Sequence, residues 1–185
     1  MNIVVYCSSR EGLGDDYEKM AQAVGNWIGS HHHTLVYGGV NAGLMHTVAQ
    51  ATADAGGNVI GIVPEMFAHR ADAVCTEVIA CHNLSDRKDL MIEKGDAYIC
   101  LPGGIGTIDE WISTLSHFKV VREQHRHIVV VNIDGAFDAQ LSQLAITADS
   151  VFTASSDYMN RMSVVTDIDQ LEKVLTERIH SYEKE

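Results

Sequence analysis

Short apolar runs alternate along the chain with segments whose apolar residues recur at helical spacing. The β-branched run NIVVYC (2–7) precedes 16–30, where Met20, Val24 and Trp27 follow one another at intervals of three and four, a spacing typical of an amphipathic helix. The same alternation predicts further strands in 34–39, 58–64, 75–82, 97–102 and 127–132. It predicts further helices over 43–55, 84–94, 108–121, 137–148 and 168–179.

This order of elements indicates the fold class. Strands that alternate with helices predict an α/β fold, a Rossmann-like, doubly wound parallel sheet with helices on both faces. The chain contains no repeat, low-complexity tract or linker, so residues 1–185 are expected to form one domain. A domain of this length buries about 70% of the surface that its unfolded chain exposes.

Four loops follow predicted strands and lead toward helices: CSSREG (7–12), YGGVNAG (37–43), VPEMF (63–67) and LPGGIGT (101–107). The carboxyl ends of parallel strands share one edge of a sheet, and ligands bind in the crevice outside that edge. The sequence therefore predicts a site assembled from loops that lie far apart in the chain.

The glycines of the last loop suggest an anion site. A glycine-rich loop that opens a helix lets the backbone approach a phosphate and directs unpaired N–H groups at it. Two other interpretations remain open for this loop, an ordinary turn and a capping box formed by Thr107 and Glu110 (T-x-x-E). The chain has no GxxxxGK[ST] motif, no G-x-G-x-x-G after the first strand and no acid after VYGG. An ATP-hydrolysing P-loop and an NAD-dependent oxidoreductase are therefore disfavoured, and a ligand smaller than a dinucleotide is expected.

Composition limits the remaining classes. A formal charge of −12 argues against nucleic-acid binding, for which a basic surface is expected. No apolar segment reaches the ~20 residues of a membrane span, and the N-terminus lacks the basic region of a signal peptide. The four cysteines are scattered without a CxxC pair, which indicates reduced thiols in a cytosolic protein. The His31–His33 run is interpreted as a loop, so no metal site is assigned.

A second motif, DRKDLM (86–91), lies in the helix that leads into the strand before the glycine loop. Arg87 and Met91 are one turn apart and share a helix face, with Lys88 beside them. An exposed pair of cations is the alternative interpretation. The position of the helix favours a role at the predicted site.

Together these motifs resemble the LOG family of cytokinin riboside 5′-monophosphate phosphoribohydrolases, often labelled lysine decarboxylases. The family signature PGGxGTxxE is matched by Pro102, Gly103, Gly104, Gly106, Thr107 and Glu110, and its upstream Arg-Lys pair by Arg87 and Lys88. YGGVNAGLM (37–45) is similar to a further family motif. The resemblance runs from VVYCSS to VVVNIDGAFD, nearly the whole chain.

The resemblance implies a homodimer that hydrolyses the N-glycosidic bond of an adenine-type nucleoside 5′-monophosphate, without a metal or redox cofactor. It implies that Arg87 and Glu110 are catalytic. The backbone of the glycine loop, with the Thr107 hydroxyl, is expected to hold the 5′-phosphate. The full expected substrate-binding set is Ser8, Gly38, Gly39, Gly43, Met45, Lys88, Met91, Gly103, Gly104, Gly106, Thr107 and Asp109.

One alternative comes from a different functional class. Molybdenum-cofactor carrier proteins use related glycine loops to bind a phosphorylated pterin without turnover. The presence of both Arg87 and Glu110 favours the enzyme, because a carrier does not need a carboxylate at the sugar.

The chain departs from the family pattern at five positions. It has Val40 in the glycine motif, His46 after Met45, Ala71 after Arg70, Asp86 before Arg87, and Trp111 after Glu110. These departures are expected near the base of the substrate, so they concern its identity more than the reaction.

Overall fold

The computed structural model describes residues 1–121, 126–148 and 157–182. Its strands are β1 Asn2–Tyr6, β2 Thr34–Tyr37, β3 Asn58–Pro64, β4 Glu77–Cys81, β5 Ala97–Cys100, β6 Ile128–Val131 and β7 Met162–Val165. Its α-helices are α1 Asp15–Ser30, α2 Gly43–Asp54, α3 Leu84–Lys94, α4 Ile105–Val121, α5 Asp138–Ala148 and α6 Ile168–Tyr182. Short 3₁₀ helices lie at η1 Glu65–Arg70, η2 Ile133–Gly135 and η3 Asp157–Arg161.

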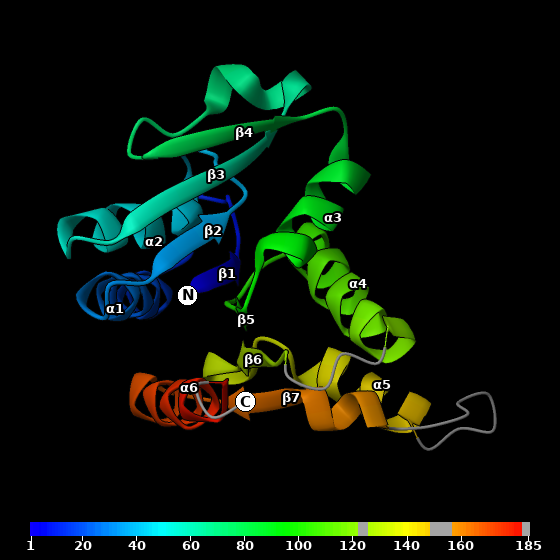
Figure 1. Cartoon of the computed structure of the whole chain (residues 1–185). Helices are drawn as coiled ribbons and strands as arrows, with labels where there is room; N and C mark the ends of the chain where they lie inside the picture. The colour runs from blue at the N-terminus through cyan, green and yellow to red at the C-terminus, as the bar shows by residue number, and fades with distance from the viewer. Residues whose placement is uncertain (122–125, 149–156, 183–185) are drawn as a thin grey trace.

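The strands of these ranges form one parallel sheet in the order β4-β3-β2-β1-β5-β6-β7. The chain builds outward from β1 to β4, then crosses back through α3 and continues on the other side of β1 (Figure 1). This confirms the predicted doubly wound α/β fold. The direction of winding reverses between β1 and β5, and such a switch point is where a crevice opens at the carboxyl edge of the sheet.

Alternating side chains of the strands fill two cores, one on each face of the sheet. In β1, Ile3 and Val5 face the core beneath α1, α2 and α6, whereas Val4 and Tyr6 face the core beneath α3, α4 and α5. Figure 1 shows the two helix groups on opposite sides of the sheet. The central strands are apolar throughout because both of their faces are covered.

The structure differs from the sequence prediction at two places. Helix α4 begins at Ile105, three residues before the predicted start, so the glycine loop passes directly into the helix. Strand β7 was not predicted. It is a four-residue edge strand in which only Val165 is buried, so it lacks the long apolar run that identifies the central strands.

Within the described ranges, no helix is both long enough and apolar enough to span a membrane.

Helices α1 and α2 cross at very short range because α1 has glycine at the crossing. A Cβ on Gly25 would lie 2.7 Å from the Cβ of Ala51 and closer still to the carbonyl oxygen of Val48. Gly29 meets Ala55 in the same way. Glycine is a poor helix former, so its presence here is explained by packing.

Gly25→Ala is expected to lower the free energy of unfolding by about 2 kcal/mol, because overpacking against backbone outweighs the roughly 1 kcal/mol of helix propensity that alanine gains. Urea denaturation measures the change. Asn26→Ala, on the exposed face of the same helix, is the control and should be neutral or stabilising by a few tenths of a kcal/mol. Stabilisation by Gly25→Ala would contradict the close crossing.

Candidate active site

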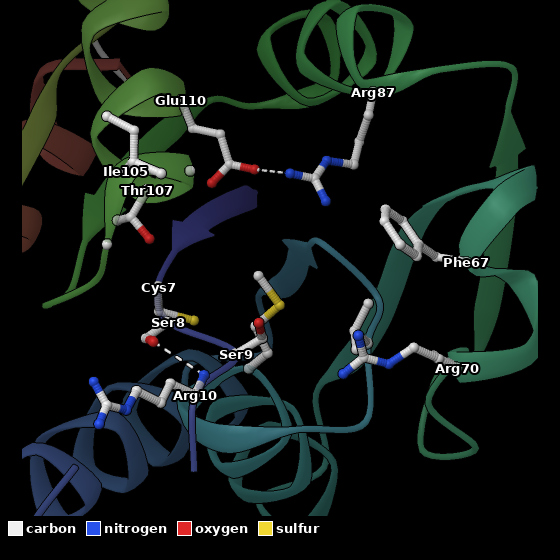
Figure 2. A pocket seen from close by; sticks show the side chains of 14 residues that line it. Cys7, Ser8, Ser9, Arg10, Phe67, Arg70, Arg87, Ile105, Thr107 and Glu110 are labelled. Carbon is white, nitrogen blue, oxygen red and sulfur yellow. Dashed lines mark hydrogen bonds and ion pairs between the residues drawn. The ribbon is translucent and has the colours of Figure 1, made fainter.

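A cavity of about 390 Å³ opens at the carboxyl edge of the sheet (Figure 2). All four predicted loops contribute to it, together with α2, α3 and α4, although these segments are far apart in sequence. Its lining residues are Cys7, Ser8, Ser9, Arg10, Val40, Met45, Phe67, Arg70, Arg87, Gly104, Ile105, Gly106, Thr107 and Glu110. The volume is in the range of small-molecule sites.

Arg87 and Glu110 form an ion pair at the wall of this cavity, between Nη2 and Oε1 (Figure 2). The Asn83 side chain caps α3 by accepting hydrogen bonds from the N–H groups of Ser85 and Asp86, at 2.8 and 3.0 Å. This cap fixes the first turn of α3, which carries Arg87. The Arg87 side chain is 12% exposed and that of Glu110 3%. Nε of Arg87 has no hydrogen-bond partner among the described residues.

Burial controls the protonation of the groups around this pair. It raises the pKa of Glu110 to about 7, although the positive charge of Arg87 acts in the opposite direction. Burial also raises the pKa of the Cys7 thiol, and the charge of Glu110 adds to the effect. The thiolate of Cys7 is therefore strongly disfavoured, whereas Glu110 can change its protonation state near neutral pH.

The glycine loop brings the N-terminus of α4 to the cavity. A Cβ on Gly103 would overlap the Thr107 side chain, so glycine is required there by packing. Gly104 and Gly106 face open space, with no described atom within 4 Å of a Cβ built on either. The capping-box interpretation is wrong, because α4 already begins at Ile105 and the Glu110 side chain pairs with Arg87.

The glycines after β2 allow the loops at this edge of the sheet to approach one another closely. Gly39 and Gly43 have φ values of +70° and +50°, which favour glycine. A Cβ on Gly43 would meet the backbone of Arg10, and one on Gly38 would lie 3.1 Å from the Met45 Cε. Ser8 joins three segments, because its N–H donates to the Pro102 carbonyl at 3.2 Å and its carbonyl accepts from the Met45 N–H at 3.3 Å.

Seven of the twelve expected substrate-binding residues are not among those that line the cavity: Gly38, Gly39, Gly43, Lys88, Met91, Gly103 and Asp109. The four glycines have the conformational and packing roles described above, and the other three residues have partners elsewhere. Met91 is fully buried in the core beneath α3 and α4. The Lys88 ammonium donates to the Asp109 carboxylate at 2.8 Å, and neither residue lines the cavity. Trp111, expected near a substrate base, is fully buried and its ring packs edge-on against Phe137 with 5.3 Å between centroids.

Arg10, Arg70 and Phe67 line the cavity although the sequence motifs did not predict them as site residues. With Arg87, the two arginines give the cavity three cations against one carboxylate, Glu110. The structure gives the guanidinium groups of Arg10 and Arg70 no partner among the described residues. Arg10 lies in the first of the converging loops, so its position and charge could have identified it. Phe67 ends the third of these loops, VPEMF (63–67), so its position gave the same signal, but it has no charge that would single it out.

Comparisons with known proteins agree with these motifs. A family model described as "Possible lysine decarboxylase" matches residues 45–175. A cytokinin riboside 5′-monophosphate phosphoribohydrolase of Rhodococcoides fascians is 41% identical over 118 residues, which are 62% of this chain and 60% of that protein. A protein of the same name from Mycobacterium marinum is 32% identical over 169 residues, 90% of this chain and 89% of that one.

The fold is also found among solved structures. The molybdenum cofactor carrier protein of Chlamydomonas reinhardtii superposes with a TM-score of 0.74 over 97% of this chain and 98% of its own. The two sequences are 18% identical, so this likeness concerns the fold.

The raised pKa of Glu110 predicts how stability depends on pH. Between its ordinary value of about 4.5 and its folded value of about 7, the folded state retains a proton that the unfolded state has lost. The free energy of unfolding therefore falls as pH rises through this interval and levels off above it. Glu110→Gln does not titrate, so wild type should lose stability relative to this variant as pH rises from the ordinary pKa of this group, about 4.5, to about 7.

Urea denaturation of both proteins at several pH values measures this difference. The free energies of unfolding of the two proteins could instead change in parallel with pH, or that of wild type could rise relative to the variant. Either result would mean that Arg87 rather than burial determines the pKa of Glu110.

Proposed function

Because this chain belongs to the LOG family, we propose that it hydrolyses the N-glycosidic bond of a purine nucleoside 5′-monophosphate. The products are the free base, adenine or an N6-modified adenine, and ribose 5-phosphate. The observation that carries the proposal is the buried pair of Arg87 and Glu110 beside a glycine loop that opens a helix. The activity for which the relatives are named supports the same reaction.

The phosphate is proposed to bind at the glycine loop. The first N–H groups of α4 have no partner within the helix, and the helix dipole favours an anion there. Gly104, Gly106 and Thr107 line this end of the cavity, and Arg10 adds a positive charge. Binding energy from this non-reacting group then positions the glycosidic bond.

Glu110 is proposed to act on the sugar. Cleavage of the C1′–N bond develops positive charge on the ribose, as in glycoside hydrolysis. A buried carboxylate stabilises that charge and orients the attacking water. A pKa of about 7 means that the carboxylate form increases through neutral pH, so activity should rise over this interval.

Arg87 is proposed to hold Glu110 in place and to assist departure of the base. Arg87 lines the cavity, so its guanidinium lies close enough to the proposed substrate position for this role. Phe67, Val40 and Met45 supply the apolar part of the lining, which suits the face of a purine. The chain is further proposed to act as a homodimer in the cytosol, on the basis of family resemblance.

The carrier alternative differs in turnover. A carrier needs the anion-binding loop but not a raised carboxylate pKa beside the sugar position. The Arg87–Glu110 pair therefore favours the hydrolase, since burying two charges is costly unless they have a role or good partners.

Release of base and ribose 5-phosphate from a panel of nucleoside 5′-monophosphates tests the reaction. We expect release from AMP or an N6-modified AMP, and none from the unphosphorylated nucleosides. Glu110→Ala and Arg87→Ala should each lower kcat by about 100-fold or more, the range for a group acting in proton transfer or charge stabilisation. Tight nucleotide or pterin binding without release from any panel member would support the carrier instead.

Gly104→Ala tests the phosphate position separately. The added methyl group meets no described atom within 4 Å, so the melting temperature should stay within about 2 °C of wild type, as a surface change predicts. The methyl group would occupy the space proposed for the phosphate and should raise KM for AMP at least tenfold. Gly103→Ala, which overlaps Thr107, should instead lower stability. Unchanged KM in Gly104→Ala would place the phosphate elsewhere.

A further inference from the structure

Two segments at which this chain departs from the family pattern are in contact in the structure. His46 follows Met45 in α2, and Asp72 follows the Arg70–Ala71 pair after η1. Nδ1 of His46 lies 2.8 Å from Oδ2 of Asp72. The Asp72 side chain is 1% exposed, and that of His46 is 40% exposed. A carboxylate oxygen can only accept a hydrogen bond, so Nδ1 of His46 is the donor.

The η1 wall, residues 65–75, packs against the core only at its C-terminal end, through Val74 and Cys75. No residue of the 3₁₀ helix η1 itself is buried. Yet this wall contributes Phe67 and Arg70 to the cavity, opposite the glycine loop (Figure 2). The position of the 3₁₀ helix η1 within this wall therefore depends mainly on hydrogen bonds made by the residues that follow it.

Those bonds connect the η1 wall to the loop that follows β2. The N–H of Asp72 donates to the Gly39 carbonyl at 2.8 Å, and the N–H of Asn41 donates to the Arg70 carbonyl at 3.0 Å. Val40 and Ala71 form an isolated antiparallel bridge. All these contacts are made by backbone atoms. The side chain of Asp72 makes a further connection of its own.

The Asp72 carboxylate uses both oxygens. Oδ1 accepts from the N–H of Val74 at 3.2 Å, within its own loop, and Oδ2 accepts from His46 in α2. Loss of one hydrogen-bond donor to a buried carboxylate strongly lowers the stability of the folded state. The histidine thus satisfies a buried charge and ties the η1 wall to the helix that carries Met45.

We propose that the His46–Asp72 pair positions the η1 wall, and with it Phe67 and Arg70, for substrate binding. His46 is in this view a positioning residue, since it does not line the cavity. The effect on substrate rests on the proposed nucleotide hydrolysis, whereas the effect on the η1 wall does not. Loss of the pair should therefore weaken binding while the Arg87–Glu110 chemistry continues.

His46→Ala is the main test, because alanine is well tolerated in a helix. We expect KM for AMP to rise about tenfold, which corresponds to loss of one hydrogen bond to a charged group, with kcat within about twofold of wild type. Amide hydrogen exchange without ligand should become faster in residues 65–75. His46→Asn places an N–H near the position of Nδ1 and should restore both measurements toward wild type.

His82→Ala is the matched control. His82 contacts the same wall through Glu65 at 4.0 Å, with both side chains largely exposed, so this variant should change neither measurement. Unaltered exchange in His46→Ala would overturn the proposal, as would a fall in kcat without a change in KM. If wild type released no base from any nucleotide, faster exchange in His46→Ala would still support the positioning of the η1 wall, and the proposed hydrolysis alone would be lost.

Discussion

The buried ion pair of Arg87 and Glu110 is the interaction on which the rest of the site depends. It joins α3 to α4 across the carboxyl edge of the sheet, and removal of either charge leaves the other buried without its counterion. The cap at Asn83 and the glycine loop before α4 set the two helix starts that make the pair possible. Burial affects the pKa of Glu110 more than the attraction of Arg87 does. The desolvation that makes burial of this charge costly therefore also brings the pKa of the carboxyl close to neutral pH.

The charge of the cavity contrasts with that of the chain. The sequence carries a formal charge of −12, but the cavity has three arginines and one carboxylate. Local cations and a helix N-terminus set the electrostatic potential inside the cavity, since charges farther than about 8 Å are largely screened at physiological salt. An acidic protein can therefore bind a nucleotide, while its overall charge still disfavours a nucleic-acid polymer.

The two walls of the cavity are held in different ways. The glycine loop lies above the central strands, tied to β1 through Ser8 and Pro102. The η1 wall lies beside the strands at the sheet edge, attached by the packing of Val74 and Cys75, by backbone bonds of the loop after β2 and by the His46–Asp72 pair. Since no residue of η1 is buried, the η1 side of the cavity has the lower density of apolar contacts, which is typical of segments that open locally.

The sequence by itself determined the parallel α/β fold and the convergence of the four loops, and its resemblance to the LOG family singled out Arg87 and Glu110, but not their pairing. Apolar periodicity reports burial on both faces of a central strand, and parallel topology fixes which loops meet. The four-residue edge strand β7 and the start of α4 gave no such signal. Only the tertiary structure decided that Met91 packs in the core, that Lys88 pairs with Asp109, and that Arg10, Phe67 and Arg70 line the cavity. The physical reason is that helical spacing tells which residues share a face, whereas the packing of neighbouring elements decides what that face meets.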